Sequence, residues 1–137
     1  MVVEDSPTVQ MLLVYLLGED SDIEVIGQAS DGLQAVEMAA RLRPDLITMD
    51  VNMPNMDGLE ATRRIMAQTP TAILLVTSHA DSQEVKAAFE ALKAGALDVM
   101  PKPVGLGGEE DDDWERGLVE KVKSLAFVFP GSRKEGL

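Results

Sequence analysis

The sequence has no cysteine, a single histidine, and aromatic residues at only 4% of its 137 positions. The absence of cysteine excludes disulfide bonds, thiol nucleophiles and thiolate metal sites, and it fits a cytosolic protein. Long hydrophobic runs are also absent, because the longest, residues 11–17, is far short of the ~20 residues that span a bilayer. The first residues lack a basic region followed by an apolar one, so the sequence predicts neither a signal peptide nor a membrane segment.

Positive charge is scarce, since 12 Lys and Arg stand against 24 Asp and Glu, a formal net charge of -12. This balance argues against a nucleic-acid-binding surface. The length allows one domain with a proper core and is too short for two ordinary domains. We expect this domain to span residues 1–129, with a linker or tail at 130–137. The glycine-rich and acidic run at 105–113 indicates a solvated loop, with a docking site for a basic partner as the alternative.

Apolar, strand-like segments alternate with segments of helical periodicity. Strands are predicted at residues 1–3, 23–29, 46–49, 72–76 and 97–100. Only three residues precede the first acids, fewer than the ~5–6 of a usual strand, so we expect the natural chain to begin earlier. Helices are expected to start at Ser6-Pro7, Asp31, Asp57-Gly58, Asp81-Ser82 and near Trp114. Five such units predict a doubly wound parallel sheet with helices on both faces and right-handed crossovers.

Helical periodicity also predicts which side chains face the core. For the first and last helices these are Val9, Leu12, Leu13, Leu16 and Leu17, and Leu118, Val119, Val122, Leu125 and Ala126. For the helix that begins at Asp31 they are Leu33, Val36 and Ala40, and for the helix after Asp81-Ser82 they are Val85, Ala88, Phe89 and Leu92.

One stretch organises the rest of the chain: the apolar run 46–49, which ends on the carboxylate of Asp50. Pro44 sets the entry to this strand, and Pro54 prevents its continuation. Asp50 should therefore lie at the carboxyl end of a central strand. In open α/β sheets, ligands bind at that edge.

The ends of the other predicted strands bring further polar side chains to this edge: Glu4 and Asp5, Thr77 and Ser78, and Lys102. Three carboxylates packed together repel, so a cation must lie among them. Oxygen ligands without His or Cys select a hard ion such as Mg²⁺. A hard ion, a lysine and a hydroxyl around a carboxylate make a site for a phosphoryl group, with Asp50 as a nucleophile that forms an acyl phosphate. Taken singly, each residue could instead be a helix-start acid, a turn former or a solvated charge.

With these residues in place, the sequence resembles the receiver domains of bacterial response regulators over nearly its whole length. The matching pieces are Val-Val-Glu4-Asp5-Ser-Pro, Asp50-Val-Asn52-Met-Pro54-Asn-Met-Asp57-Gly58, Val-Thr77-Ser78, and Gly95-Ala-Leu-Asp98 leading to Lys102-Pro103. The resemblance implies a flavodoxin-like sheet with strand order 2-1-3-4-5. It also implies a role in two-component signalling, with a histidine kinase as the phosphodonor.

Carried over residue by residue, the resemblance makes Asp50 the phospho-acceptor. It implies that Glu4, Asp5, Asp50 and the backbone carbonyl of Asn52 hold Mg²⁺. Thr77 and Lys102 would contact the phosphoryl group, and the Lys102–Pro103 peptide is expected to be cis.

One position departs from the family pattern. Receivers usually carry a Tyr or Phe switch residue three positions before the lysine, and Val99 stands there. This departure argues against coupling of Thr77 to an aromatic flip and leaves the phosphorylation chemistry untouched. His79 has no second metal ligand at helical spacing, so we expect it to be a surface or loop residue.

Within the family, the stretch from Asp50 and the Val-Thr-Ser end of the fourth strand look most like the receiver half of chemotaxis protein-glutamate methylesterases. The chain has no Gly-x-Ser-x-Gly elbow and no room for a hydrolase domain. We therefore expect a receiver that is not itself an enzyme and that controls an output domain, a chemotaxis methylesterase domain missing from this chain. The alternatives are a stand-alone or other-output regulator, a haloacid-dehalogenase-like phosphatase, whose motif wants an Asp where Asn52 stands, and a pseudo-receiver.

Overall fold

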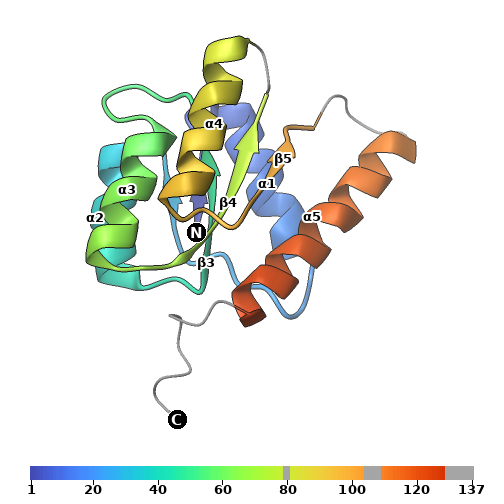
Figure 1. The fold of residues 1–137 in the computed structure, drawn as a ribbon. Coiled ribbons are helices and arrows are strands. Elements are labelled where there is room, and N and C mark those ends of the chain that lie inside the picture. The colour runs from blue at the N-terminus through green and yellow to red at the C-terminus, as the bar shows by residue number, and fades with distance from the viewer. Residues whose placement is uncertain (79–80, 104–108, 129–137) are drawn as a thin grey trace.

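The computed structural model describes residues 1–78, 81–103 and 109–128, with the backbone alone for residues 109–111 and 128. Strands and helices alternate along this part of the chain (Figure 1). In chain order they are β1 (Val2–Val3), α1 (Pro7–Gly18), β2 (Gln28–Ala29), α2 (Gly32–Leu42), β3 (Leu46–Asp50), α3 (Gly58–Gln68), β4 (Ala72–Thr77), α4 (Ser82–Ala94), β5 (Asp98–Pro101) and α5 (Glu109–Val128). None of the helices in these ranges has both the length and the apolar composition that crossing a bilayer requires.

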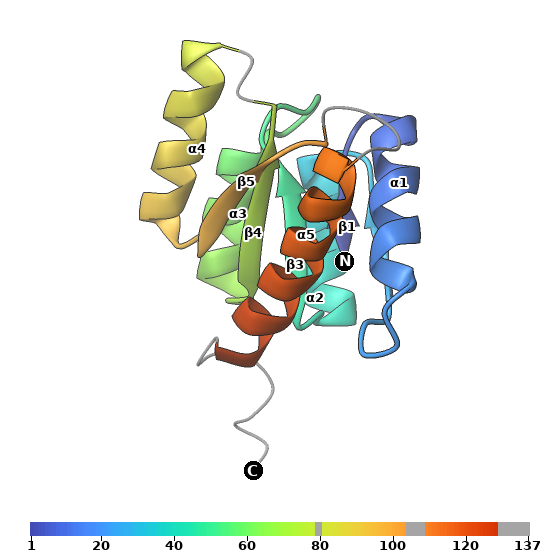
Figure 2. The same ribbon diagram turned by 90° about the vertical axis from the view of Figure 1, so that its right-hand side faces the viewer.

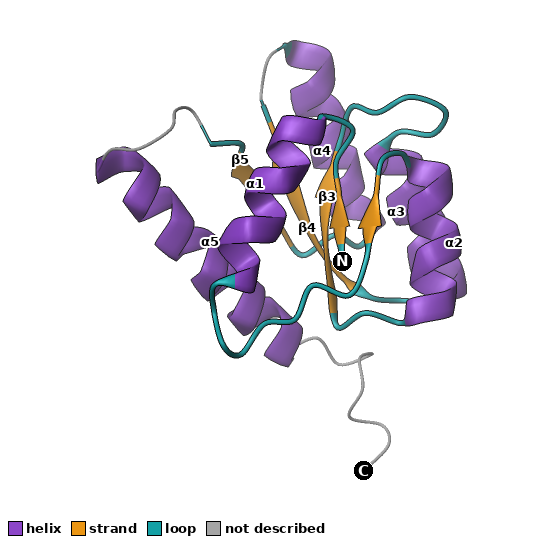
Figure 3. Ribbon diagram, turned by 180° about the vertical axis from the view of Figure 1, so that it is seen from behind, coloured by secondary structure: helices purple, strands orange, loops and turns teal. Residues whose placement is uncertain are grey.

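The strands form one parallel sheet in the order β2-β1-β3-β4-β5, which confirms the predicted topology. Within it, Asp50 at the end of β3 pairs with Val76, and Thr77 at the end of β4 pairs with Pro101. This register brings the carboxyl ends of the three strands β3, β4 and β5 to one edge. The end of β1 joins them, because Val3 pairs with Met49. Figure 3 shows the strands running side by side between the helices.

The sheet separates two apolar cores, one on each face. Figure 2 shows α3 and α4 on one side of the sheet and α1 on the other. Alternate side chains of the central strands enter each core: Ile47, Met49, Ile73 and Leu75 face α2, α3 and α4, while Leu46, Leu74 and Val76 face α1 and α5. Burial on both faces explains why β3 and β4 read as almost continuous apolar runs.

The predicted helix starts of α1 to α4 are confirmed, and each is fixed by a side-chain cap. Ser6, Asp31, Asp57 and Asp81 each accept a hydrogen bond from the backbone N–H three residues ahead. Such caps satisfy amides that have no partner inside the helix. Because each of these helices follows a strand of the parallel sheet, all four begin at the edge of the sheet where Asp50 lies.

Two close backbone contacts hold the loop 51–57, which follows Asp50. The Gly58 N–H donates to Val51 O at 2.7 Å, and a Cβ at Gly58 would lie only 2.1 Å from the carbonyl oxygen of Asp50. At Gly32 the N–H donates to Met56 O at 2.9 Å, and a Cβ would lie 2.3 Å from that oxygen. Only glycine permits both approaches, and together they fix the backbone around Asp50.

Two predicted boundaries were wrong. The second strand is confined to Gln28–Ala29 instead of residues 23–29, because its partner β1 offers only two residues for pairing. The last helix begins at Glu109 and not near Trp114, so residues 109–113 of the acidic run belong to α5. Acidic residues are favoured in a first helical turn, where they offset the helix dipole. The predicted tail at 130–137 and His79 lie outside the described residues.

Some predicted core positions were also wrong. Leu33 and Ala40 of α2 are exposed, as are Val85 and Phe89 of α4, the last with 62% of its surface accessible. These helices instead bury their small residues, Ala35 and Ala39 in α2 and Ala88 and Ala91 in α4. The face of each helix that packs on the sheet is thus formed by small residues, and the larger apolar residues lie beside that face.

Candidate functional site

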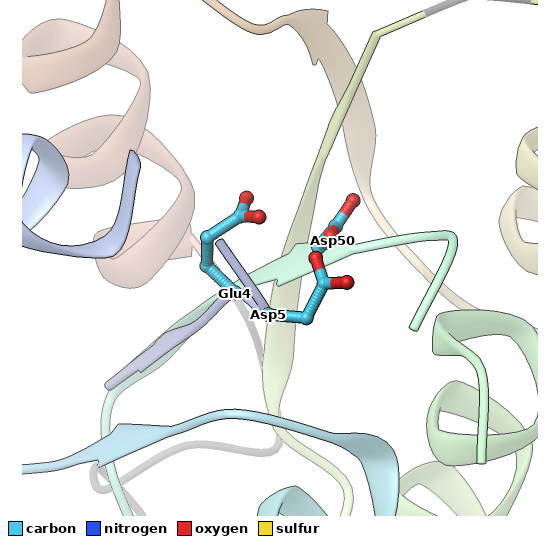
Figure 4. A group of neighbouring side chains, drawn as sticks. All are labelled: Glu4, Asp5 and Asp50. Atoms are coloured by element: carbon cyan, nitrogen blue, oxygen red, sulfur yellow. The ribbon is translucent and has the colours of Figure 1, made fainter. Parts of the chain in front are cut away.

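Three carboxylates meet at the carboxyl edge of the sheet. Glu4 and Asp5 directly follow β1, and Asp50 ends the neighbouring strand β3. One carboxylate oxygen of each lies within 4.8 Å of the others. Figure 4 shows the carboxyl groups of Asp5 and Asp50 next to each other, with Glu4 beside them. The sequence prediction that these residues come together is thus matched by their positions.

The burial of this cluster is unusual for acids. Glu4 and Asp50 are each only 1% exposed, whereas Asp5 is exposed to solvent. Glu4 Oε1 and both carboxylate oxygens of Asp50 are buried without a hydrogen-bond partner among the described residues. Buried polar atoms normally find partners, so these oxygens indicate a place for a ligand that supplies positive charge. Oxygen atoms alone, with one side open, fit a hard divalent cation such as Mg²⁺.

Lys102 provides the positive charge found at the cluster. Its Nζ lies 3.1 Å from Glu4 Oε2 and 3.3 Å from Asp50 Oδ1. Its backbone N–H donates to the carbonyl oxygen of Thr77 at 2.9 Å, which fixes the residue at the end of β5. Burial lowers the pKa of Lys102, but the carboxylates of Asp50 and Glu4 raise it by more. Lys102 is therefore a firmly protonated cation.

The protonation of Asp50 is strongly perturbed. Burial, the neighbouring carboxyl group of Asp5 and the charge of Glu4 raise the pKa of Asp50 to about 8, against the opposing effect of Lys102. One lysine thus does not neutralise the cluster when it is free of metal. A divalent cation would favour the ionised form of Asp50 and so make it a better nucleophile.

Thr77 is placed at the end of β4, but its hydroxyl is engaged with a residue that the sequence analysis did not single out. Thr77 Oγ1 donates a hydrogen bond to Oε2 of Glu84, a buried residue in the first turn of α4. The same oxygen accepts from the backbone N–H and the hydroxyl of Ser78, both at 2.8 Å. The spacing of Asp81 and Glu84 is that of a capping box, and this signal could have drawn attention to Glu84.

The loop after β3 carries the remaining predicted ligand. Asn52 lies two residues beyond Asp50, with an exposed side chain, and the role of its backbone carbonyl stays a prediction. Farther along, Asn55 adopts φ 66° and donates through Nδ2 to Asp31 Oδ2 at 2.8 Å, which ties the loop to the start of α2. This tie keeps the loop beside the acidic cluster.

The predicted cis peptide was wrong. Among the described residues no peptide bond is cis, so the bond between Lys102 and Pro103 is trans. The trans form is the lower-energy isomer for X–Pro by ~0.5–1 kcal/mol. Val99, at the usual aromatic switch position, lies half-buried in β5 and packs against the core on the α2, α3 and α4 face.

Comparison with known families agrees with this architecture. A model of the response regulator receiver domain matches residues 1–108. The chain belongs to the response regulator receiver domain family. The receiver is also 39% identical to the response regulator domain of Thermotoga maritima CheB, with a TM-score of 0.82 and coverage of 94% of this chain and 96% of that one. The receiver domain of NarL from Mycobacterium tuberculosis matches with a TM-score of 0.77 at 26% identity, covering 93% and 94% of the two chains.

Similar full-length proteins are protein-glutamate methylesterase/protein-glutamine glutaminases. The receiver is 44% identical to the one from Nitrosospira multiformis and 50% identical to one from Anaeromyxobacter dehalogenans, each over 93% of this chain. It spans 36% and 37% of the length of those two proteins. The predicted link to chemotaxis receivers and two-component signalling is therefore confirmed at the level of family.

Proposed function

We propose that this receiver accepts a phosphoryl group on Asp50 from a histidine kinase and thereby switches an output domain. The observation that carries the proposal is the buried carboxylate of Asp50, whose two oxygens lack hydrogen-bond partners among the described residues while Lys102 lies 3.3 Å away. A carboxylate kept in this state is available as a nucleophile.

The transfer balances without any further reactant. An oxygen of Asp50 attacks the phosphorus of a phosphohistidine, and a new P–O bond forms as the P–N bond breaks. The imidazole nitrogen leaves with the bonding electron pair and takes a proton from solvent water. Lys102, already paired with Asp50 and Glu4, offsets the charge that gathers on the phosphoryl oxygens in the transition state. We expect the Thr77 hydroxyl, at the end of β4, to leave Glu84 and donate to one of these oxygens.

We propose that Glu4, Asp5, Asp50 and the backbone carbonyl of Asn52 hold Mg²⁺. When bound, the ion supplies charge neutralisation to the carboxylates and to the phosphoryl oxygens. The fit is supported by oxygen-only ligands and by the unpartnered oxygens of Glu4 and Asp50.

We further propose that the output is a methylesterase domain that follows the receiver, as in the relatives of which this chain spans 36% and 37%. The receiver unit would then extend to residue 129, just beyond the end of α5 at Val128, with 130–137 as the linker. A cytoplasmic location follows from a kinase that draws its phosphoryl groups from ATP.

Intact-mass measurement after treatment with acetyl phosphate tests the proposal. The expected result is a single phosphoryl adduct that requires Mg²⁺ and is absent from Asp50→Asn. Asp31→Asn is a matched control, because Asp31 is also a buried aspartate at the edge of the sheet but caps α2. An adduct that persists in Asp50→Asn would refute the assigned acceptor. Steady turnover of acetyl phosphate without a retained adduct would favour a phosphatase.

A further inference from the structure

Glu84 is a buried carboxylate that none of the chemistry above uses. It lies in the first turn of α4, is 8% exposed, and directs Oε2 back to the end of β4. That oxygen accepts hydrogen bonds from the hydroxyls of Thr77 and Ser78 and from the Ser78 N–H. The carboxylate therefore joins the helix to the strand end at the residue assigned to the phosphoryl group.

A role in capping alone does not explain this arrangement. The amide of Glu84 is already capped by Asp81 Oδ1 at 2.8 Å. In a capping box the glutamate at this position returns to the N–H of the cap residue. Here its Oε2 instead reaches Ser78 and the Thr77 hydroxyl, six and seven residues back.

A threonine hydroxyl carries one proton, so it donates to one acceptor at a time. While Thr77 donates to Glu84, it cannot donate to a phosphoryl oxygen on Asp50. We propose that Glu84 is a positioning residue that competes with the phosphoryl group for the Thr77 hydroxyl, and that this competition couples phosphorylation to the start of α4. The inference rests on the proposed phosphorylation of Asp50 and deepens it.

The consequence for the fold follows from where Glu84 lies. When Thr77 turns to the phosphoryl group, Glu84 loses one of the contacts that tie α4 to β4, and the first turn of the helix is released from the strand end. Val85, the next residue, is 47% exposed on the outer surface of α4, so the release alters a surface that a partner can reach. This route needs no aromatic residue at Val99.

The test compares the affinity of beryllofluoride, a phosphoryl mimic, in the presence of Mg²⁺ for the wild type and Glu84→Gln. Glutamine keeps the size of the side chain and an acceptor for the Ser78 N–H, but its neutral oxygen holds the Thr77 hydroxyl less strongly. We expect the mimic to bind about tenfold more tightly to Glu84→Gln, since a charge-assisted competitor has been removed. Glu90→Gln changes a partly exposed carboxylate on the same helix that pairs with Lys93, and it should leave the affinity unchanged.

A double-mutant cycle separates this competition from a structural role. With Thr77→Val there is no hydroxyl to contest, so Glu84→Gln should have no further effect on affinity. With Thr77→Ser the hydroxyl is restored, and the tightening should return. Equal affinities of wild type and Glu84→Gln, or the same tightening in the Thr77→Val background, would overturn the inference.

Two measurements distinguish a failure of the competition from a folding defect of the variant and from a failure of the proposed function. If Glu84→Gln does not fold, the NMR amide resonances of Ser78 and Glu84 in the wild type provide the test instead. They should shift on addition of the mimic, and they should stay unchanged in Thr77→Val. A wild type that binds the mimic while those resonances stay still refutes the competition alone. A wild type that neither binds the mimic nor takes up a phosphoryl group refutes the proposed function and the competition with it.

Discussion

Two groups of buried acids lie at the same edge of the sheet and differ in how their charge is accommodated. Glu4 and Asp50 have oxygens without hydrogen-bond partners among the described residues and share one lysine. Glu84 instead holds three donors on one oxygen. The unsatisfied group costs folding free energy that a bound cation can recover, whereas the satisfied group fixes local structure. The oxygens of Glu4 and Asp50 are therefore available to a ligand, whereas Glu84 stabilises the local fold.

The largest effect on the group formed by Glu4 and Asp50 is expected from a change in the backbone that contacts Asp50. Gly58→Ala would place a Cβ 2.1 Å from the carbonyl oxygen of Asp50, so we expect a loss of about 3 kcal/mol in the free energy of unfolding. Urea denaturation measures this loss. Gly117→Ala in α5 is the matched control, because nothing lies within 4 Å of its Cβ position, and it should stabilise the protein by about 0.5–1 kcal/mol. Similar effects at both glycines would contradict the close approach.

Replacing Lys102, the lysine shared by Glu4 and Asp50, tests whether its charge serves the phosphoryl transfer. In Lys102→Met the charge on the phosphoryl oxygens is no longer offset, and we expect adduct formation from acetyl phosphate to slow by about a hundredfold. The initial rate in intact-mass experiments provides the measurement. Lys93→Met, which removes an exposed lysine from α4, should react at the wild-type rate. A wild-type rate in Lys102→Met would show that Lys102 does not serve the transfer.

The raised pKa of Asp50 predicts a pH dependence of the metal-free protein. Because the folded-state pKa, about 8, lies above the ordinary value of 3.8, the native state binds this proton more tightly. The stability from this group is full below about pH 4 and is lost as the pH rises towards 8. Asp50→Asn removes the dependence and should be more stable than the wild type at pH 8 by about 2 kcal/mol. The measurement is the free energy of unfolding of both proteins, from urea denaturation in EDTA between pH 5 and 9. Parallel plots of this free energy against pH would contradict the prediction.

The smallest effect that we expect is the change in protein stability caused by Mg²⁺ binding to the acidic cluster. At pH 8, millimolar Mg²⁺ should stabilise the wild type by about 1 kcal/mol, since only the folded state gathers the three carboxylates. Thermal unfolding with and without EDTA measures this gain. Asp5→Asn should lose most of it, whereas Asp22→Asn, an exposed acid paired with Lys123, should keep it. Equal stabilisation of both variants would place the ion elsewhere.

Much of the fold could be predicted because its local signals agree with one another. The caps at Ser6, Asp31, Asp57 and Asp81 define the helix starts, and the apolar runs of β3 and β4 could only be buried strands. Strand β2 could not be bounded in this way. Its apolar alternation extends over residues 23–29, but the two-residue partner β1 limits the pairing to Gln28–Ala29.

The outward positions of Val85 and Phe89 were missed for a different reason. Periodicity identifies an apolar stripe but not which side of that stripe faces the sheet. In α4 the small residues Ala88 and Ala91 are buried, and the larger Val85 and Phe89 are exposed.

The acidic cluster was predicted correctly because strand order alone brings the chain segments after β1 and β3 together. Strand order also placed Thr77 at the end of β4. It could not give the partner of the Thr77 hydroxyl, because that contact depends on the path of the segment between β4 and α4. A glutamate at this spacing usually serves its own helix, so sequence pattern alone assigned it no further role.

The last consequence concerns Trp114, the one tryptophan in the sequence. Its indole N–H donates to the carbonyl oxygen of Pro101 at 2.6 Å, one residue before Lys102. A fluorophore is thus anchored to the backbone that carries the lysine, and the chain has no second indole to add background emission. Titrations of metal or phosphodonor can therefore be followed by the intrinsic fluorescence of the unlabelled protein, with Trp114 as the probe.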